Sequence, residues 1–293
     1  DSMVYDKATE WKVFETEGPC VAFTVAGNTV WKATADKVST VHVKSGKFKV
    51  YPMLGKTAAS GVTAMATDAS GRPWIGTPEG VVVYNKGTFA LYSTENGLCG
   101  NKVNAILAAP DRTVWVGTDK GASAYRNGSF ESYTKEHGLR GDRVQAIAVD
   151  HRGAIWLGTN NGISVYSGGA WTSHSMDNGL SWNDTKALAF DPRKKQMWAA
   201  VGDEDVNCYD GKKWKVYMAV QQGITCIMVD TQSRVWFGST ETLLKFNGEE
   251  WLTDPQRIGV PAKLVSQMHR DKAGNLWFAS ENGVIYLKNP YPF

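Results

Sequence analysis

The chain has 293 residues, of which 42% are hydrophobic and 21% charged, and it contains 30 glycines. Its 32 basic and 29 acidic residues leave a net charge of +3, and the longest basic run is Arg193-Lys194-Lys195, so no stripe for a nucleic acid is present. No window reaches the roughly 20 apolar residues that a membrane-spanning helix needs. The composition fits a folded protein that is rich in turns.

A repeat of about 40 residues runs along the chain. It is anchored by seven tryptophans, and successive anchors lie 38 to 43 residues apart: Trp31, Trp74, Trp115, Trp156, Trp198, Trp236 and Trp277. The text around the anchor recurs, as in Trp115-Val116-Gly117-Thr118 and Trp156-Leu157-Gly158-Thr159. A period of this size is typical of repeat folds and must be explained before any other feature.

Each repeat predicts four short antiparallel strands. In the fourth repeat, an apolar strand at 144–149 precedes a turn at 150–153, in which Asp150 opens the turn and Gly153 permits a positive φ. The tryptophan strand follows, then residues 162–166, and then an aromatic strand at 171–174. Four such strands make one propeller blade, so the sequence predicts an all-β, seven-bladed β-propeller in one domain spanning residues 1–293.

The two ends of the chain predict how the ring closes. An aromatic fourth-strand motif at Trp11 and Phe14 precedes the first tryptophan anchor, whereas the last repeat ends near residues 283–287 with no fourth strand after it. We therefore expect the N-terminal strand to complete the last blade and remove an exposed sheet edge.

The repeat resembles that of the two-component regulator propeller family, found in bacterial sensor proteins. The resemblance rests on Asn96-Gly97-Leu98, Val103-Asn104-Ala105-Ile106 and Trp115 to Gly121, and it is fullest in repeats 2 to 4. The glycine six residues after tryptophan is missing from repeats 1, 5 and 6, which carry Lys37, Glu204 and Thr242 instead.

The resemblance implies a sensing part outside the cytoplasm, that is, a periplasmic or secreted location. It implies binding of a small-molecule or glycan ligand, or of a protein partner, and no cofactor. No transmembrane segment or kinase sequence accompanies the repeats. The chain is either an excised sensor region or a stand-alone relative, and ring closure within these residues favours the second.

Four longer connections enter repeats 3, 4, 5 and 7, and they are predicted to gather on one face of the ring. They run from Glu95 to Lys102, Lys135 to Arg143, Met176 to Asp184 and Asp254 to Lys263. Longer polar loops are where binding residues concentrate. The candidate ligand-binding residues on these loops supply stacking surface and hydrogen-bonding groups suited to sugars or carboxylates: His137, Arg140, Asp142, Arg143, Trp182 and Asn183.

The first strands supply a second group of candidates around the channel. Equivalent positions of the seven repeats are assigned to Cys20, Thr63, Asn104, Gln145, Lys186, Thr225 and Ser266. Asn104, Gln145 and Lys186 are the ligand-binding candidates of this ring. The alternative is that small polar side chains near the axis satisfy strand backbone and buried water.

The sequence names no catalytic residue and no metal site. The cysteines lack CxxC spacing, no pair of histidines has the spacing of metal ligands, and Asp203-Glu204-Asp205 lacks the pattern of a calcium loop. The four cysteines fall in different repeats and are expected to remain free thiols. His269 near Asp271, with Glu281 beyond, is a weak echo of the streptogramin B lyases, which are also seven-bladed propellers.

Three functions are therefore compatible with the sequence. A non-catalytic ligand-binding or protein-interaction propeller is favoured, because no catalytic constellation is visible. The alternatives are a metal-dependent enzyme similar to the streptogramin lyases and a structural component of a surface assembly.

Overall fold

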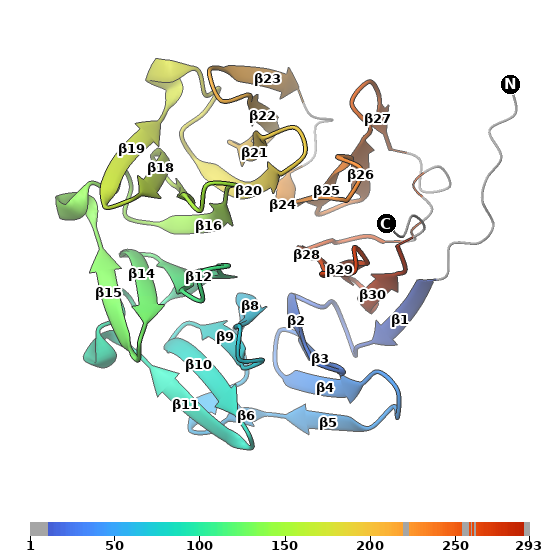
Figure 1. Cartoon of the computed structure of the whole chain (residues 1–293). Coiled ribbons are helices and arrows are strands. Elements are labelled where there is room, and N and C mark those ends of the chain that lie inside the picture. The colour runs from blue at the N-terminus through green and yellow to red at the C-terminus, as the bar shows by residue number, and fades with distance from the viewer. Residues whose placement is uncertain (1–10, 219–222, 254–257, 259, 261, 290–293) are drawn as a thin grey trace, which may run out of the picture.

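The structure is a computed structural model, and it describes residues 11–218, 223–253, 258, 260 and 262–289. Seven four-stranded antiparallel sheets are arranged around a central axis, which confirms the predicted seven-bladed β-propeller (Figure 1). A further two-stranded sheet and three 3-10 helices lie in the connections between blades. No helix of the described residues is long and apolar enough to cross a membrane.

The blades follow one another in chain order, and each runs from an inner to an outer strand. Blade 1 comprises β2 (Ala22–Ala26), β3 (Thr29–Ala33), β4 (Val38–His42) and β5 (Phe48–Tyr51). Blade 2 comprises β8 (Ala64–Thr67), β9 (Pro73–Thr77), β10 (Gly80–Asn85) and β11 (Thr88–Tyr92). Blade 3 comprises β12 (Val103–Ala108), β13 (Val114–Thr118), β14 (Gly121–Arg126) and β15 (Ser129–Tyr133). The hairpin β6 (Met53–Leu54) and β7 (Thr57–Ala58) links blades 1 and 2.

The second half of the ring repeats this order. Blade 4 comprises β16 (Val144–Val149), β17 (Ile155–Thr159), β18 (Gly162–Ser167) and β19 (Ala170–His174). Blade 5 comprises β20 (Thr185–Asp191), β21 (Gln196–Val201), β22 (Asp205–Tyr209) and β23 (Trp214–Met218). Blade 6 comprises β24 (Ile224–Val229), β25 (Val235–Ser239), β26 (Leu243–Phe246) and β27 (Trp251–Leu252).

Blade 7 joins the two ends of the chain. Its strands β28 (Gln267–Arg270), β29 (Leu276–Ser280) and β30 (Gly283–Leu287) are completed by β1 (Trp11–Glu15). The antiparallel register places Trp11 opposite Leu287 and Phe14 opposite Val284, and β1 and β30 lie side by side in Figure 1. The predicted closure by the N-terminal strand is thereby confirmed, and blade 7 gains a fourth strand from the other end of the sequence.

The anchor tryptophans are fixed by the turn that precedes them. In four blades the indole Nε1 donates to the carboxylate six residues earlier, as from Trp74 to Asp68 at 2.9 Å and from Trp236 to Asp230 at 3.0 Å. The other oxygen of the same carboxylate accepts backbone N–H groups within the turn. One aspartate therefore closes the hairpin and orients the buried indole.

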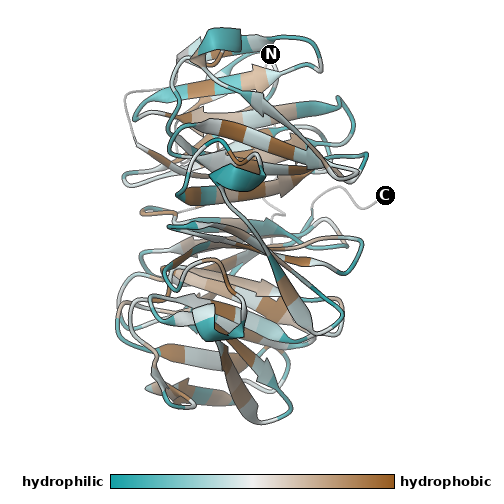
Figure 2. Ribbon diagram, turned by 90° about the vertical axis from the view of Figure 1, so that its left-hand side faces the viewer, coloured by the Kyte–Doolittle hydropathy of each residue, from teal (hydrophilic) through white to brown (hydrophobic). Residues whose placement is uncertain are grey.

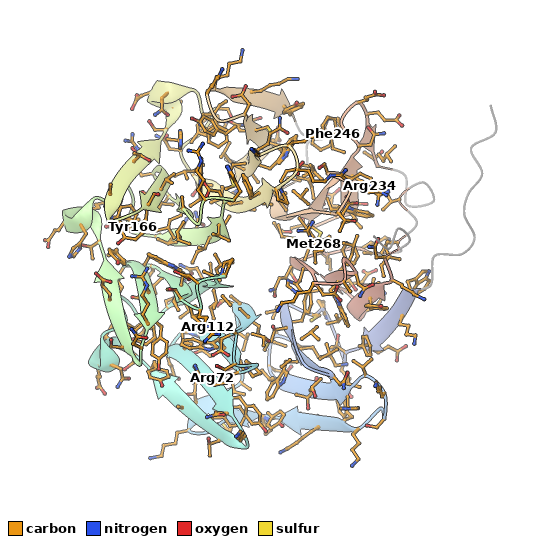
Figure 3. All side chains as sticks on the ribbon, viewed as in Figure 1. Arg72, Arg112, Tyr166, Arg234, Phe246 and Met268 are labelled. Atoms are coloured by element: carbon orange, nitrogen blue, oxygen red, sulfur yellow. The ribbon has the colours of Figure 1, made fainter. Side chains whose placement is uncertain are left out.

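Aromatic rings fill the seams between blades. At several seams, the anchor tryptophan and the fourth-strand aromatic residue of one blade contact aromatic residues of the third and fourth strands of the next, as Trp115 contacts Tyr166 and Tyr133 contacts Trp171. Figure 3 labels Tyr166 and Phe246 at two of these seams. Apolar residues occupy the interior of the blades and polar residues the connections (Figure 2). The core is thus distributed over the seams, and no side chain needs to fill the centre of the ring.

All four cysteines are free, as the sequence predicted. Burial raises the pKa of the Cys20 and Cys208 thiols to about 12, so neither is a thiolate near neutral pH.

Candidate functional site

A cavity of about 470 Å³, lined mainly by polar and charged residue types, lies at one mouth of the central channel. Its lining residues come from the inner strands and from the connections that enter them: Thr63, Lys102, Asn104, Arg143, Gln145, Lys186, Gly223, Ile224, Thr225 and Thr240. The cavity opens on the face that carries the long connections, which we call the long-loop face. Four of the nine predicted site residues line it, namely Asn104, Arg143, Gln145 and Lys186.

Two layers of equivalent positions build the wall. The outer layer stands just before the first strand of each blade, where blades 3, 4 and 5 carry Lys102, Arg143 and Asp184. The inner layer lies two residues further on and consists of the channel ring. On blade 6 the same two positions are Gly223 and Thr225, so small residues leave open the space that the charged side chains face.

Part of the channel ring joins neighbouring blades. Thr63 Oγ1 donates to the carbonyl oxygen of Val103 at 2.6 Å, Asn104 Nδ2 to that of Val144 at 3.2 Å, and Ser266 Oγ to that of Cys20 at 2.8 Å. Each bond runs from the first strand of one blade to the start of the next. For these residues, the alternative interpretation of polar side chains that satisfy strand backbone describes what the structure shows.

The sequence alignment of the ring was wrong by one residue in blade 1. The strand register pairs Ala22 with Ala33 as it pairs Ala64 with Gly76, so the counterpart of Thr63 is Val21 and not Cys20. The hairpin of blade 1 is one residue shorter, since Thr24 pairs with Trp31 whereas Ala66 pairs with Trp74, so counting back from the tryptophan overshot the ring position. The ring is therefore apolar at blade 1, and Cys20 is a buried residue whose carbonyl accepts from Ser266.

The ring changes character at blades 4 and 5. Gln145 Nε2 donates to Asp184 Oδ1 at 2.7 Å, and Lys186 Nζ donates to Asp203 Oδ1 at 2.5 Å. Arg143 Nη2 lies 3.9 Å from the same Asp184 oxygen. The hydrogen bond and charge of Lys186 lower the pKa of Asp203. Gln145 still joins blade 4 to blade 5, but through a side-chain carboxylate, whereas Lys186 bonds within blade 5.

His137, Asp142 and Asn183 hold the connections in shape. The amide N–H of Thr134 donates to His137 Nδ1 at 3.1 Å, which closes the 3-10 turn η2 (Lys135–His137) as a capping box. Asn183 Oδ1 accepts from the amide of Met176 at 2.9 Å, and Asp142 Oδ2 accepts from Lys135 Nζ at 2.6 Å. None of the three lines the central cavity.

Arg140 bridges two connections on the long-loop face. Its Nε donates to the carbonyl oxygen of Asn161 at 2.9 Å, and its Nη2 lies 3.3 Å from Asp177 Oδ2 in the connection that enters blade 5. The guanidinium is thus engaged by its neighbours at the rim of the face, away from the residues that line the cavity.

Trp182 presents its indole to solvent, with 55% of its surface exposed. It occupies the place held by Gly100 and Gly141 in the two preceding connections, and it lies over Gly202 of the β21–β22 turn. The predicted stacking surface therefore exists on the long-loop face. The connection from Asp254 to Lys263 falls largely outside the described residues.

The sequence missed Lys102, Thr240 and Asp203 as parts of this site. Lys102 had a detectable signal, because it stands 41 residues before Arg143, at the same position of the repeat. Thr240 and Asp203 belong to the turns between second and third strands, which also open on the long-loop face. Those turns are short, and loop length alone did not single them out.

The fold does not bring together the residues whose pattern weakly resembles a lyase site, His269, Asp271 and Glu281. Asp271 Oδ2 accepts from Trp277 Nε1 at 3.1 Å and from Asn275, so this carboxylate has the structural role of the other turn aspartates. Asp271 precedes β29 and Glu281 follows it, which places them on opposite faces of the disc. Within the described residues, no group of three or more His, Cys, Asp and Glu side chains is arranged to hold a metal ion.

Comparisons with known proteins agree with the repeat. The model of the family described as "Two component regulator propeller" matches residues 138–161. Among curated proteins, no sequence matches this chain.

Solved structures with the same fold are similar to this chain at low sequence identity. One is the extracellular domain of BT3049 from B. thetaiotaomicron, described as a hybrid two-component system, with a TM-score of 0.73 and 15% identity; the match covers 94% of this chain and 40% of that one. A virginiamycin B lyase from Staphylococcus aureus matches with a TM-score of 0.75 and 15% identity, over 96% of this chain and 99% of that one. YCF48 bound to a D1 peptide matches with a TM-score of 0.71 and 12% identity, over 99% of each chain.

These likenesses show the fold, and this chain spans less than half the length of the BT3049 structure. The chain is a seven-bladed β-propeller whose fourth repeat carries the two-component regulator propeller motif.

Proposed function

We propose that the chain, residues 1–293 as one domain, is a non-catalytic sensing propeller that binds a small anionic ligand at the mouth of its channel. One observation carries the proposal: Lys102, Arg143 and Lys186, from three consecutive blades, line a single cavity of about 470 Å³. That volume is within the range of about 300–1,000 Å³ typical of small-molecule sites.

The charges of the wall favour an anion. Lys102, Arg143 and Lys186 contribute three positive charges, and Asp184 and Asp203 contribute two negative charges. Among the described residues, the ammonium of Lys102 has no carboxylate partner. The Arg143 guanidinium lies 3.9 Å from Asp184, too far for a strong hydrogen bond. A carboxylate or phosphate would therefore find one unpaired ammonium and one guanidinium free to bind it with two hydrogen bonds.

The uncharged lining residues determine which other groups the ligand carries. Gln145, Asn104, Thr225 and Thr240 offer amide and hydroxyl groups around the same space. Such groups pair with ligand hydroxyls, so a hydroxylated carboxylate or an acidic sugar fits better than a purely apolar acid. The exposed indole of Trp182 supplies a stacking surface on the same face for a longer glycan or a protein partner.

The sensor-domain neighbours support a periplasmic or secreted location, since two of them are described as extracellular domains of bacterial regulatory systems. In that location, the ligand reaches the protein without having to enter the cell. We include this location in the proposal.

Isothermal titration calorimetry with citrate, glucuronate and inorganic phosphate, and with neutral glucose as the comparison, tests the proposal. We expect at least one anion to bind and glucose to bind at least tenfold more weakly. The variants Lys102→Gln and Arg143→Gln should each weaken the bound anion by roughly 5- to 100-fold, because charged hydrogen bonds contribute about 1–3 kcal/mol.

Arg152→Gln on the opposite face is the matched control and should leave anion binding unchanged. An equal loss of anion affinity in the Arg152 variant would show that the anion responds to the overall charge of the protein and not to a specific site. Failure of all three anions to bind at millimolar concentration would overturn the anionic ligand.

A further inference from the structure

The outer rim holds a second pocket, which lies at the seam between blades 7 and 1. It has a volume of about 190 Å³ and is lined by Glu15, Thr16, Glu17, Thr34, Lys37, Ser39, Phe48 and Val50. We call it the rim pocket. Glu15 to Glu17 follow the closing strand β1, and Ser39, Phe48 and Val50 belong to the outer strands of blade 1.

Blades 3, 4 and 5 show what fills the equivalent space. There the preceding connection lies on the outer strands, and its backbone donates to a polar side chain of the third strand. The amide of Cys99 donates to Ser123 Oγ at 2.8 Å, that of Arg140 to Ser164 Oγ at 2.8 Å, and that of Ser181 to Asn207 Oδ1 at 2.9 Å. A glycine two residues earlier lies against the first aromatic residue of the fourth strand, as Gly138 lies against Trp171.

Blade 1 has the receiving groups but not the connection. Ser39 pairs with Val50 as Ser123 pairs with Ser132, and Phe48 stands where Phe130 stands in blade 3. The entering connection, residues 16–21, is shorter than residues 134–143 of blade 4. Its Gly18 has no neighbour within 4 Å of the position of an added Cβ, so it does not cover Phe48.

The receiving groups are consequently covered only in part, since the contact of the Phe48 ring is with the Lys32 ammonium, 5.6 Å from its centroid. Ser39 is only 6% exposed, yet its hydroxyl makes no hydrogen bond among the described residues, whereas its counterparts Ser123 and Ser164 each accept one. Phe48 and Val50 are 60% and 42% exposed. The counterpart of Phe48 in blade 5, Trp214, which the connection covers, is only 8% exposed, so the open face of Phe48 is where a segment from outside can complete this surface.

Lys32 sets the depth of the pocket. It is the counterpart of Val116 and Leu157, against which the connections of blades 3 and 4 place a leucine. The Lys32 ammonium reaches across the seam and donates to the carbonyl oxygens of Phe14 and Glu15. The deep part of the seam is therefore filled, and only the shallow part can accept a chain with small side chains.

The charges around the pocket are balanced. Glu17 is paired with Lys37, and the Lys32 ammonium lies close enough to Glu15 for the two charges to interact. Shape and hydrogen bonding, rather than a surplus charge, therefore define the partner. We propose that the rim pocket binds an extended segment of a partner protein, which lays small residues over Phe48 and donates a backbone N–H to Ser39.

The probe is an acetylated and amidated octapeptide with the sequence of residues 134–141, the segment that fills the equivalent space in blade 4. Its leucine is replaced by alanine, because Lys32 occupies the deep space. Titration of the ¹⁵N-labelled full chain should give saturable shifts at the amides of Ser39 and Val50, with a dissociation constant on the order of 1 mM, as expected for a short unstructured peptide.

Three variants of the protein make the result specific. Val50→Asp should abolish the shifts, and Val216→Asp should not, although Val216 is the counterpart of Val50 in blade 5 and is 45% exposed. Ser39→Ala should keep the melting temperature and weaken binding by about 3- to 10-fold through the lost hydrogen bond.

Absence of saturable shifts at 10 mM peptide would overturn the proposal. So would equal effects of Val50→Asp and Val216→Asp, or shifts confined to the central cavity. The central anion site is not involved, so this test succeeds or fails separately from that of the proposed function.

Discussion

The indole of Trp182 lies directly over Gly202, where an added Cβ would come within 2.8 Å of the ring. The two preceding connections have the opposite arrangement, with glycine at 100 and 141 and a larger residue, Asp119 or Asn160, in the facing turn. The bulk of one side chain has moved from the turn to the connection. Each partner therefore requires the other.

This exchange predicts a coupled pair of substitutions. Gly202→Asn should displace the indole and lower the free energy of unfolding, whereas the double variant Trp182→Gly/Gly202→Asn should recover most of the loss, because it recreates the pair of blade 4. The coupling energy should be about 0.5–3 kcal/mol, as for residues in direct contact. Urea denaturation of the two single variants and the double variant measures it, and additive effects would contradict the exchange.

Ala109 is predicted to be a site where one substitution stabilises the protein. Trp115 Nε1 is buried and has no hydrogen-bond partner, because Ala109 stands where blades 2, 4, 6 and 7 have the aspartate that accepts from the anchor tryptophan. The turn geometry is the same, since the amide of Arg112 donates to Ala109 as that of Gly153 donates to Asp150.

Ala109→Asp should therefore raise the free energy of unfolding by about 1 kcal/mol. Thermal melting followed by circular dichroism reports the change. The control is the same substitution in a Trp115→Phe background, where the new carboxylate has no indole to bind and the gain should disappear. A gain of the same size in both backgrounds would mean that the turn, and not the indole, is the source.

The burial of His174 predicts that the stability of the fold decreases as the pH falls. It replaces the tyrosine of this position and stacks on Trp156 at a centroid distance of 5.1 Å, and burial lowers its pKa from 6.5 to about 4. Because the folded pKa lies below the unfolded value, the neutral ring is favoured in the folded state. The associated stability is present above about pH 6.5 and is lost as the pH falls toward 4.

We expect this loss to amount to about 1–2 kcal/mol, a value reduced from the full shift because the ring keeps partial contact with solvent. Melting temperatures between pH 7 and pH 4.5 should fall less in His174→Tyr than in the natural chain. Parallel curves for the two proteins would assign the acid sensitivity to other groups.

The closing strand predicts the effect of shortening the chain. Removal of residues 1–16 takes away all five residues of β1, exposes the edge of β30 and removes Phe14 from its stack on Trp277. The truncated protein should lose several kcal/mol of stability and associate through the free edge. Calorimetry and light scattering measure both, and an unchanged melting temperature would contradict the closure.

The sequence predicted most of the fold, because the repeat supplies many copies of one local pattern. Seven tryptophans, the turns before them and the unpaired first strand were sufficient to specify blades, order and closure. The alignment failed at Cys20, because the hairpin before the tryptophan of blade 1 is one residue shorter than that of blade 2, as the pairs Thr24–Trp31 and Ala66–Trp74 show. The partner of the buried indole was also missed, because a turn aspartate reads as a turn signal and its second oxygen is visible only in three dimensions.

The candidate site was predicted less well, for a physical reason. Loop residues such as His137 and Asn183 are polar and repeat-specific, which suggests binding, but their polar atoms complete the hydrogen bonds of their own connections. Lys186 and Gln145 are found at the cavity because the ring position is fixed by the strand. Position within a strand was thus more informative than residue type within a loop.

The pairing of Trp11 with Leu287 has a consequence for synthesis of the chain. The two strands that complete blade 7 are separated by almost the whole sequence, and the entropy of closing a loop rises with its length. A ribosome delivers β1 first and β30 last. While blades 1 to 6 are being made, β1 has no native partner, and its backbone donors and acceptors stay open to other chains. The ring therefore becomes resistant to misassembly only in one late step, the pairing of β1 with β30. A pulse-labelling experiment on the nascent chain would measure when this pairing occurs.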